Sequence, residues 1–179
     1  MDNDVVEACI GGMSMGIRIT NISKSESNKG RRIVICYVKD NQGIEDTYKL
    51  SSFEIARPEM EDAWEAINIA YQRVHPDYKD DETWVDFAFS RVGIKYVQSL
   101  KGDIVIKEFR LSGVMAWDYM GFSTITTDKI SPQQNEELTA AVCKLIKEAE
   151  LYVQGKRAQM QLFRDRFVRD ADKEEMEEG

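Results

Sequence analysis

The stretch that decides the fold covers residues 16–53 and reads GIRITNISKSESNKGRRIVICYVKDNQGIEDTYKLSSF. Its apolar residues alternate with polar ones in runs that are rich in β-branched side chains, a pattern typical of half-buried strands. Two polar segments, Ser23–Gly30 and Asp40–Gly43, separate these runs and are typical of turns. The stretch therefore predicts three consecutive strands.

An amphipathic helix is expected after the third strand. Pro58 suits the first position of a helix, and Glu59, Glu61 and Asp62 are acidic residues of the kind that stabilise a helix N-terminus. Apolar residues then recur every three or four positions as far as Val74, which places them on one helix face.

The same order of elements is expected a second time. Lys29-Gly30 resembles Lys101-Gly102, each followed by a run of β-branched residues, and Gly16-Ile17-Arg18 resembles Gly93-Ile94-Lys95. A third strand over residues 121–130 precedes a helix with apolar residues from Leu138 to Val153, for which Ser131 is the expected N-cap.

Both halves thus predict a β-β-β-α unit, and we interpret the repetition as an internal duplication. We expect one α+β domain over residues 1–163, with half-repeats at about 16–75 and 93–154 and two long helices on one face of a mainly antiparallel sheet. Residues 76–92 would connect the halves, with Trp84, Phe87 and Phe89 fixing the connection to the core. The charged segment 164–179 would form a flexible tail.

Composition limits the classes of function. The chain is 42% hydrophobic and 31% charged, which favours a packed core over disorder. Its net charge of −8 disfavours a protein that binds duplex DNA through phosphate contacts alone. The acidic N-terminus and the absence of a long apolar run indicate neither a signal peptide nor a membrane span, so we expect a cytoplasmic protein.

No local motif for catalysis or metal binding is present. The sequence lacks the glycine-rich nucleotide loops and the serine hydrolase elbow, and its single histidine and three separated cysteines do not form a transition-metal motif. We expect no catalytic residue, no metal and no cofactor. An enzyme with a site built from distant residues stays an alternative.

The basic turn Lys29-Gly30-Arg31-Arg32 is a candidate anion site. Glycine lets backbone amides approach an anion, and the arginine guanidinium matches phosphate oxygens. The second half keeps only Lys101-Gly102, with Asp103 where an arginine would help. Lys29, Arg31, Arg32 and Lys101 are therefore candidate nucleotide-binding residues, and a simple exposed hairpin turn is the alternative.

The segment Gln159-Met160-Gln161-Leu162-Phe163 is a candidate docking peptide. It resembles the bacterial sliding-clamp-binding peptide, in which a glutamine and an aliphatic residue precede a Leu-Phe pair. In such a peptide Leu162 and Phe163 would fill an apolar cleft, and Gln159 would hydrogen bond at its edge next to Met160. Alternatively, Met160 and Phe163 prolong the apolar face of the preceding helix through Gly155.

A wider resemblance extends over residues 107–163. With the strand Phe122-Ser123-Thr124-Ile125 and the ending Gly155-Lys156-Arg157-Ala158-Gln159, this region is similar to small proteins of tailed bacteriophages. The resemblance implies a phage protein in the cytoplasm of a bacterial host, and it implies no reaction.

Two functional hypotheses follow. In the first, a non-enzymatic phage accessory protein binds the host sliding clamp, or another replication or recombination protein, through Gln159–Phe163. In the second, an oligomeric counter-defence protein sequesters a signalling nucleotide, and its basic turns meet across subunits.

Overall fold

The computed structural model describes residues 16–74, 85–117 and 121–155. In its first half, β1 (Ile17–Ser27), β2 (Gly30–Asn41) and β3 (Ile44–Ser52) precede α2 (Pro58–Val74). In its second half, β4 (Val85–Gln98), β5 (Ile104–Trp117) and β6 (Gly121–Thr126) precede the 3-10 helix η3 (Pro132–Gln134) and α3 (Glu136–Val153).

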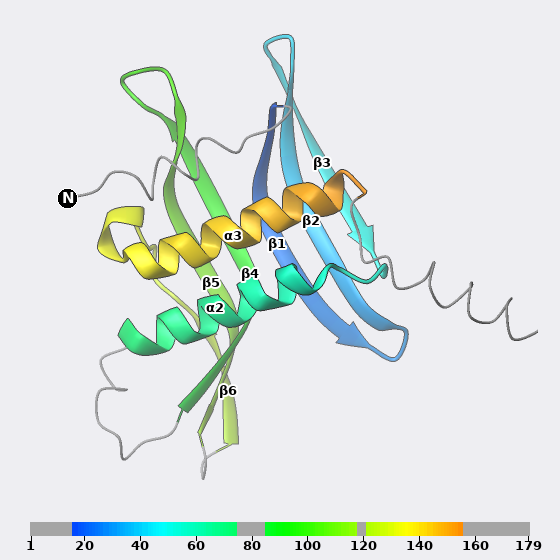
Figure 1. Ribbon diagram of the computed structural model, residues 1–179, viewed down its shortest axis with the longest axis vertical. Helices are drawn as coiled ribbons and strands as arrows, with labels where there is room; N and C mark the ends of the chain where they lie inside the picture. Colours follow the sequence, from blue (N-terminus) through cyan, green and yellow to red (C-terminus); the bar gives the residue numbers. More distant parts are fainter. Residues whose placement is uncertain (1–15, 75–84, 118–120, 156–179) are drawn as a thin grey trace, which may run out of the picture.

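The strands form one antiparallel sheet in the order β3-β2-β1-β4-β5-β6 (Figure 1). The three strands of the first unit form one half of the sheet, and the three strands of the second unit form the other half. The two β-β-β-α units therefore meet where β1 pairs with β4. The α+β class, the antiparallel sheet and the two helices are confirmed. The duplication itself stays a prediction, although the two units share one element order.

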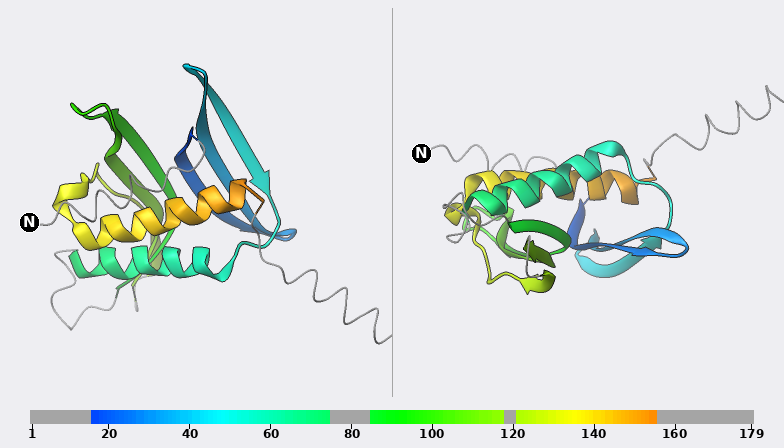
Figure 2. Two further views of the ribbon diagram at one scale, coloured as in Figure 1. Left: turned by 45° about the horizontal axis from the view of Figure 1, so that its top comes forward. Right: turned by 90° about the horizontal axis from the view of Figure 1, so that it is seen from below.

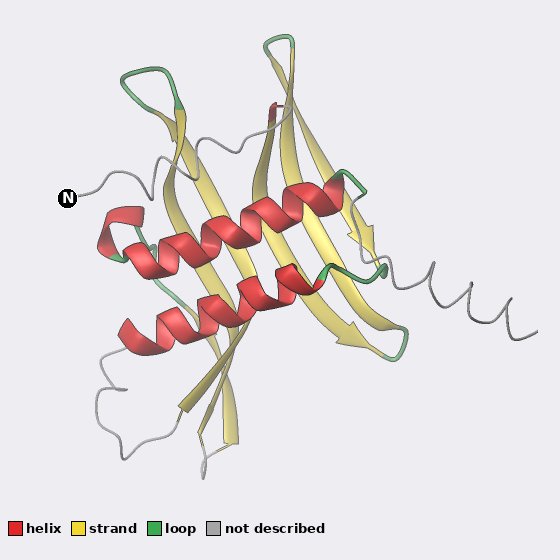
Figure 3. Ribbon diagram, in the orientation of Figure 1, coloured by secondary structure: helices red, strands yellow, loops and turns green. Residues whose placement is uncertain are grey.

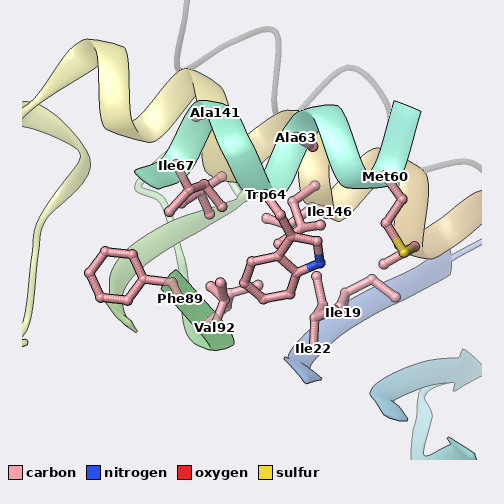
Figure 4. Packing of buried hydrophobic residues seen from close by; sticks show 14 of the residues in the cluster. Ile19, Ile22, Met60, Ala63, Trp64, Ile67, Phe89, Val92, Ala141 and Ile146 are labelled. Atoms are coloured by element: carbon pink, nitrogen blue, oxygen red, sulfur yellow. The ribbon is translucent and has the colours of Figure 1, made fainter. Parts of the chain in front are cut away.

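Both helices lie on one face of the sheet (Figures 1 and 3). Trp64 of α2 is 2% exposed and lies among Ile19, Ile22 and Val92 of the central strands (Figure 4). Burying large apolar side chains from both helices against both central strands is the main stabilising contribution in such a core. The core therefore joins the two halves beneath the helices.

The second half begins earlier than the sequence predicts. Phe87 and Phe89 belong to β4 and are buried, so they are not part of a connection. Gly93 lies inside β4, opposite Asn21, whereas Gly16 precedes β1, so these two glycines are not equivalent. Only the Lys-Gly pairs at the two hairpin turns correspond.

The start of the second helix also differs from the prediction. Ser131 precedes η3, where its backbone N–H donates to Oε1 of Gln134 at 2.9 Å. The N-cap of α3 is Asn135, whose side-chain oxygen accepts the N–H of Leu138 at 2.9 Å. Proline after Ser131 starts a short 3-10 turn, and asparagine then provides the acceptor that begins the α-helix.

Among the described residues, neither helix is long and apolar enough to cross a bilayer.

Candidate functional site

The basic turn between β1 and β2 is neutralised on its helix-facing side. Arg31 contacts Glu26 at 2.8 Å and Glu61 of α2 at 2.7 Å. The hydrogen bond and charge of Arg31 lower the pKa of Glu26, as pairing between opposite charges does. Arg31 is therefore engaged in the fold and does not present a free charge to an anion.

Arg32 lies on the opposite face because successive strand residues point to opposite sides. Its Nε donates to the Ser51 hydroxyl of β3 at 2.7 Å. Lys29 is exposed in the turn itself, where its backbone N–H donates to the Ser27 hydroxyl. The three basic residues of this turn thus occupy three different environments.

The turn between β4 and β5, which contains Lys101, lies at the opposite end of the sheet from the turn between β1 and β2 (Figure 1). β1 and β4 are antiparallel, so the turns that follow them point in opposite directions. Within one chain, Lys29 and Lys101 cannot share a ligand. A nucleotide site formed by these turns from different subunits stays a prediction.

The candidate docking residues Gln159, Met160, Leu162 and Phe163 lie outside the described residues. The structure does show how the preceding helix ends. Gly155 has a φ of 83°, and its N–H donates to the carbonyl of Tyr152. This conformation ends α3 at Val153, so the helix does not run on through Gly155 as the alternative interpretation required.

A different surface combines the features expected of a binding site. No helix or strand in the described parts of the chain covers the sheet face that points away from α2 and α3 (Figure 2). We call this the open face. Two cross-strand rows at its centre are fixed by the strand register. The first contains Ser51, Val34, Ser23, Arg91, Ser112 and Thr126, and the second contains Lys49, Cys36, Asn21, Gly93 and Arg110.

These two rows contain three cations and no carboxylate. Arg91 donates to the Asn21 side-chain oxygen at 2.9 Å, which holds its guanidinium against β1. Within the described chain, Arg91, Arg110 and Lys49 form no ion pair, and all three are exposed. The centre of the open face is therefore a positive surface with hydroxyl and amide groups between the charges.

The carboxylates on the same face lie outside the two rows, and two of them form ion pairs, whereas Asp86 near the start of β4 is exposed and forms none with a described residue. Glu45 contacts Arg18, and Glu108 contacts Lys95 at 3.4 Å and Lys129 at 3.5 Å. Burial raises the pKa of Glu108, but the two lysines outweigh burial and lower it below its ordinary value. Glu45 and Glu108 thus neutralise an arginine and two lysines that flank the central cations.

Charge is divided between the two layers of the fold. The six strands carry ten lysines and arginines and six carboxylates, whereas α2 and α3 carry eight carboxylates and three basic residues. The strands of the sheet therefore carry a net positive charge although the chain as a whole has a net charge of −8. The sheet layer is therefore electrostatically more favourable for an anion than the helix layer.

One end of the open face combines small and apolar side chains with one exposed carboxylate, Asp86, which pairs with Ala116. Ala88 pairs with Val114 across β4 and β5, and Ala116 pairs with Phe122 across β5 and β6. Phe122 is 79% exposed, more than any core residue and unusual for a side chain of its size. A basic centre thus borders an exposed aromatic side chain.

The described residues contain no group of three or more histidine, cysteine or acidic side chains placed to hold a metal ion. The open face presents guanidinium and ammonium groups, hydroxyl and amide groups, and the exposed aromatic ring of Phe122.

No family model, curated protein or solved structure matches the chain. The function must therefore be inferred from the chemistry of its surfaces.

The sequence prediction missed Arg91, Arg110 and Phe122. Arg110 lies between the buried residues Phe109 and Leu111, an alternation that indicates an outward side chain. That signal was available in the sequence. The pairing of β4 with β5, which brings Arg110 beside Gly93, was not.

Proposed function

We propose that this chain is a binding protein whose open face holds the phosphate backbone of a nucleic acid. The observation that carries the proposal is the pair of central rows, with no carboxylate and three cations that form no ion pair with a described residue, in a chain of net charge −8. Lysine and arginine at such positions gain affinity by releasing the counterions of phosphates.

The spacing of the cations favours an extended ligand. Lys49 lies on β3 and Arg110 on β5, which are four strand spacings apart, or about 19 Å. That distance is too long for the phosphates of one mononucleotide to contact both side chains. A polymer with regularly spaced phosphates can contact both at once.

Gly93 offers a sharp test of the open face. It lies between the cations, and an added Cβ would meet no atom within 4 Å, so a larger residue fits without a clash. Gly93→Asp places a carboxylate at the centre of the rows, and Gly93→Asn is the neutral control of the same shape. We expect the aspartate variant to lose binding of a labelled oligonucleotide, while the asparagine variant keeps it.

Salt dependence measures how many cations take part. If Lys49, Arg91 and Arg110 each neutralise one phosphate of a single strand, affinity should fall roughly 20-fold as salt rises from about 50 to 200 mM. Arg73→Gln changes the net charge by the same amount as Gly93→Asp but removes a cation of α2 that is paired with Glu137, so it is the charge-matched control for that variant.

Equal binding by the Gly93→Asp and Gly93→Asn variants would refute the proposal.

A second proposed function concerns the segment after α3. The hydroxyl of Tyr152 donates to the Glu54 carbonyl at 2.6 Å, which fixes the end of the helix to the body before Gly155 ends it. This ending supports a peptide that leaves the helix. We propose that Gln159, Met160, Leu162 and Phe163 dock on the sliding clamp of a bacterial host, or on another replication or recombination protein, in the host cytoplasm.

The docking proposal has its own test. Replacement of Leu162 and Phe163 by alanine should abolish binding to purified bacterial sliding clamp in a pull-down, and Gln161→Ala should not, because that position takes a small or polar residue. Clamp binding that survives the double replacement would refute it. Together the two proposals describe a phage accessory protein that brings nucleic acid and a replication protein together without catalysing a reaction.

The rival hypothesis, an oligomer that sequesters a signalling nucleotide, makes a different prediction. Cyclic dinucleotides would raise the melting temperature, and replacing Lys29 or Lys101 would remove that effect. The mass of the protein in solution would then exceed that of one chain, which is 20.6 kDa.

A further inference from the structure

Phe122 is an exposed aromatic residue whose side chain lies on the open face. It is 79% exposed on β6, the strand at the edge of the sheet. Its face follows from the register. Thr126 donates to the Ser112 hydroxyl at 3.2 Å in the first central row, and Phe122 lies four residues before Thr126, on the same side of β6. Phe122 therefore projects from the open face.

The residues around Phe122 leave its ring uncovered. Its cross-strand partner is Ala116, and Ala88 and Val114 form the neighbouring pair. The phenylalanine ring stands out above these short side chains, and Asp86 lies at the other end of its cross-strand row, beyond Ala116. An exposed ring beside small residues can accept the flat face of another ring, and nucleic-acid bases are such rings.

The distance from the cations sets the length of ligand that both features can hold. Phe122 is two strand spacings from Arg91 and four residues further along the strand direction, about 16 Å in all. One nucleotide cannot reach both points, and a short run of nucleotides can. Phe122 and the basic centre then contact successive parts of one chain.

We propose that the ligand of the open face is a single-stranded nucleic acid, with Phe122 stacking on one base while Arg91 and Arg110 contact phosphates. This inference rests on the proposed binding of a phosphate backbone at the open face. It goes further by stating that the nucleic acid is single-stranded. The bases of a duplex are paired and stacked on each other, so they do not offer a free face to Phe122.

The number of cations and the exposed aromatic ring both favour a single-stranded ligand. Three cations on the open face are few for a duplex binder in so acidic a chain, because such proteins depend on many phosphate contacts. Single-strand binders combine a modest positive surface with aromatic stacking, which contributes to affinity for any base sequence. The open face has both parts, and it has them on one continuous surface.

The experiment compares three variants of Phe122 on three ligands. Phe122→Ala removes the ring, Phe122→Leu keeps apolar bulk without a ring, and Phe122→Tyr keeps the ring. The ligands are a labelled single-stranded oligonucleotide, the same oligonucleotide as a duplex, and an abasic strand of equal length that has phosphates and no bases. Affinity is measured by fluorescence anisotropy at one salt concentration.

We expect the alanine and leucine variants to bind the single strand roughly 5- to 100-fold more weakly, and the tyrosine variant to bind within about twofold of the parent. The parent should prefer the single strand to the abasic strand by a similar factor, and the alanine variant should not distinguish them. Leu100→Ala is the control, since it removes a fully exposed apolar residue at the far turn between β4 and β5.

Each result separates the inference from the proposed function. If the Gly93→Asp variant loses binding but the Phe122 variants bind like the parent, phosphates are held and the stacking role is wrong. Equal affinity for duplex and single strand would also overturn it. If no ligand binds in a way that depends on Gly93, the proposed function itself fails. A change from dimer to monomer in the alanine variant, without a change in affinity, would assign Phe122 to a contact between copies of the chain.

Discussion

Glu150 gives the protein a stability that should depend on pH. It lies on α3 and is 6% exposed, and no hydrogen bond to its carboxylate joins it to the other described residues. Burial raises its pKa to about 7, and Lys147 opposes the shift only in part. Its charge also contributes to the raised pKa of Tyr96, which is already desolvated by burial and donates to the Ile19 carbonyl.

The sign of the effect follows from proton binding. The folded chain holds the Glu150 proton up to about pH 7, whereas the unfolded chain releases it near the ordinary value of 4.5. Folding therefore takes up a proton between these limits, so the free energy of unfolding falls as pH rises from about 4.5 to 7 and levels off above. The shift corresponds to a loss of at most about 3 kcal/mol.

Glu150→Gln tests this directly, because it keeps the shape and removes the charge. In urea unfolding, we expect the variant to be more stable than the parent by roughly 1 to 3 kcal/mol at pH 8, with a difference that shrinks toward zero near pH 4.5. Glu65→Gln, on the exposed side of α2, should show no such pH dependence. A constant difference between parent and variant across this range would refute the reasoning.

Three further predictions concern the fold. Gly113→Ala should destabilise the protein by about 2 kcal/mol or more, because its Cβ would lie 2.2 Å from the Ala88 carbonyl oxygen, and urea unfolding measures this. Asn135→Ala should cost about 1 kcal/mol through loss of the N-cap of α3, with a lower melting temperature. Ile67→Ala, at a fully buried position on the sheet-facing side of α2, should cost about 2 to 5 kcal/mol, and a smaller loss would show that the core collapses around it.

The strands and helices could be predicted from the sequence because each of them buries only one of its faces. Ile17, Ile19 and Ile22 alternate with polar residues, and the helices repeat their apolar residues every three to four positions, so local patterns carry this information. The start of β4 was missed although Phe87 and Phe89 alternate in the same way. The apparent match of Gly16 with Gly93 placed the second unit too late, since short similarities do not measure structural equivalence.

The candidate site was harder to predict because it depends on pairing between distant strands. Arg31 and Arg32 are adjacent in sequence, yet one pairs with Glu61 under the helices and the other faces the open side. Lys29 and Lys101 look equivalent and lie at opposite ends of the sheet. Arg91 and Arg110 become neighbours only through the register of β4 with β5, which no local pattern specifies.

The short seam between β1 and β4 has a consequence for how the chain folds. Asn21, Ile22 and Ser23 pair with Gly93, Val92 and Arg91, residues that are far apart along the chain, whereas the hairpins on either side join near neighbours. Contacts between distant residues carry the larger loop-closure cost, so we expect this seam to close late.

Both central rows cross that seam, which makes them complete only in the fully folded chain. A strand of nucleic acid that lies across them would contact both halves and stabilise their association. At a ligand concentration a hundredfold above Kd it would add about 2.7 kcal/mol to the free energy of unfolding. Hydrogen exchange at Ile22 and Val92 would then slow on addition of ligand, and the pace at which these amides open would report how firmly the halves are held together.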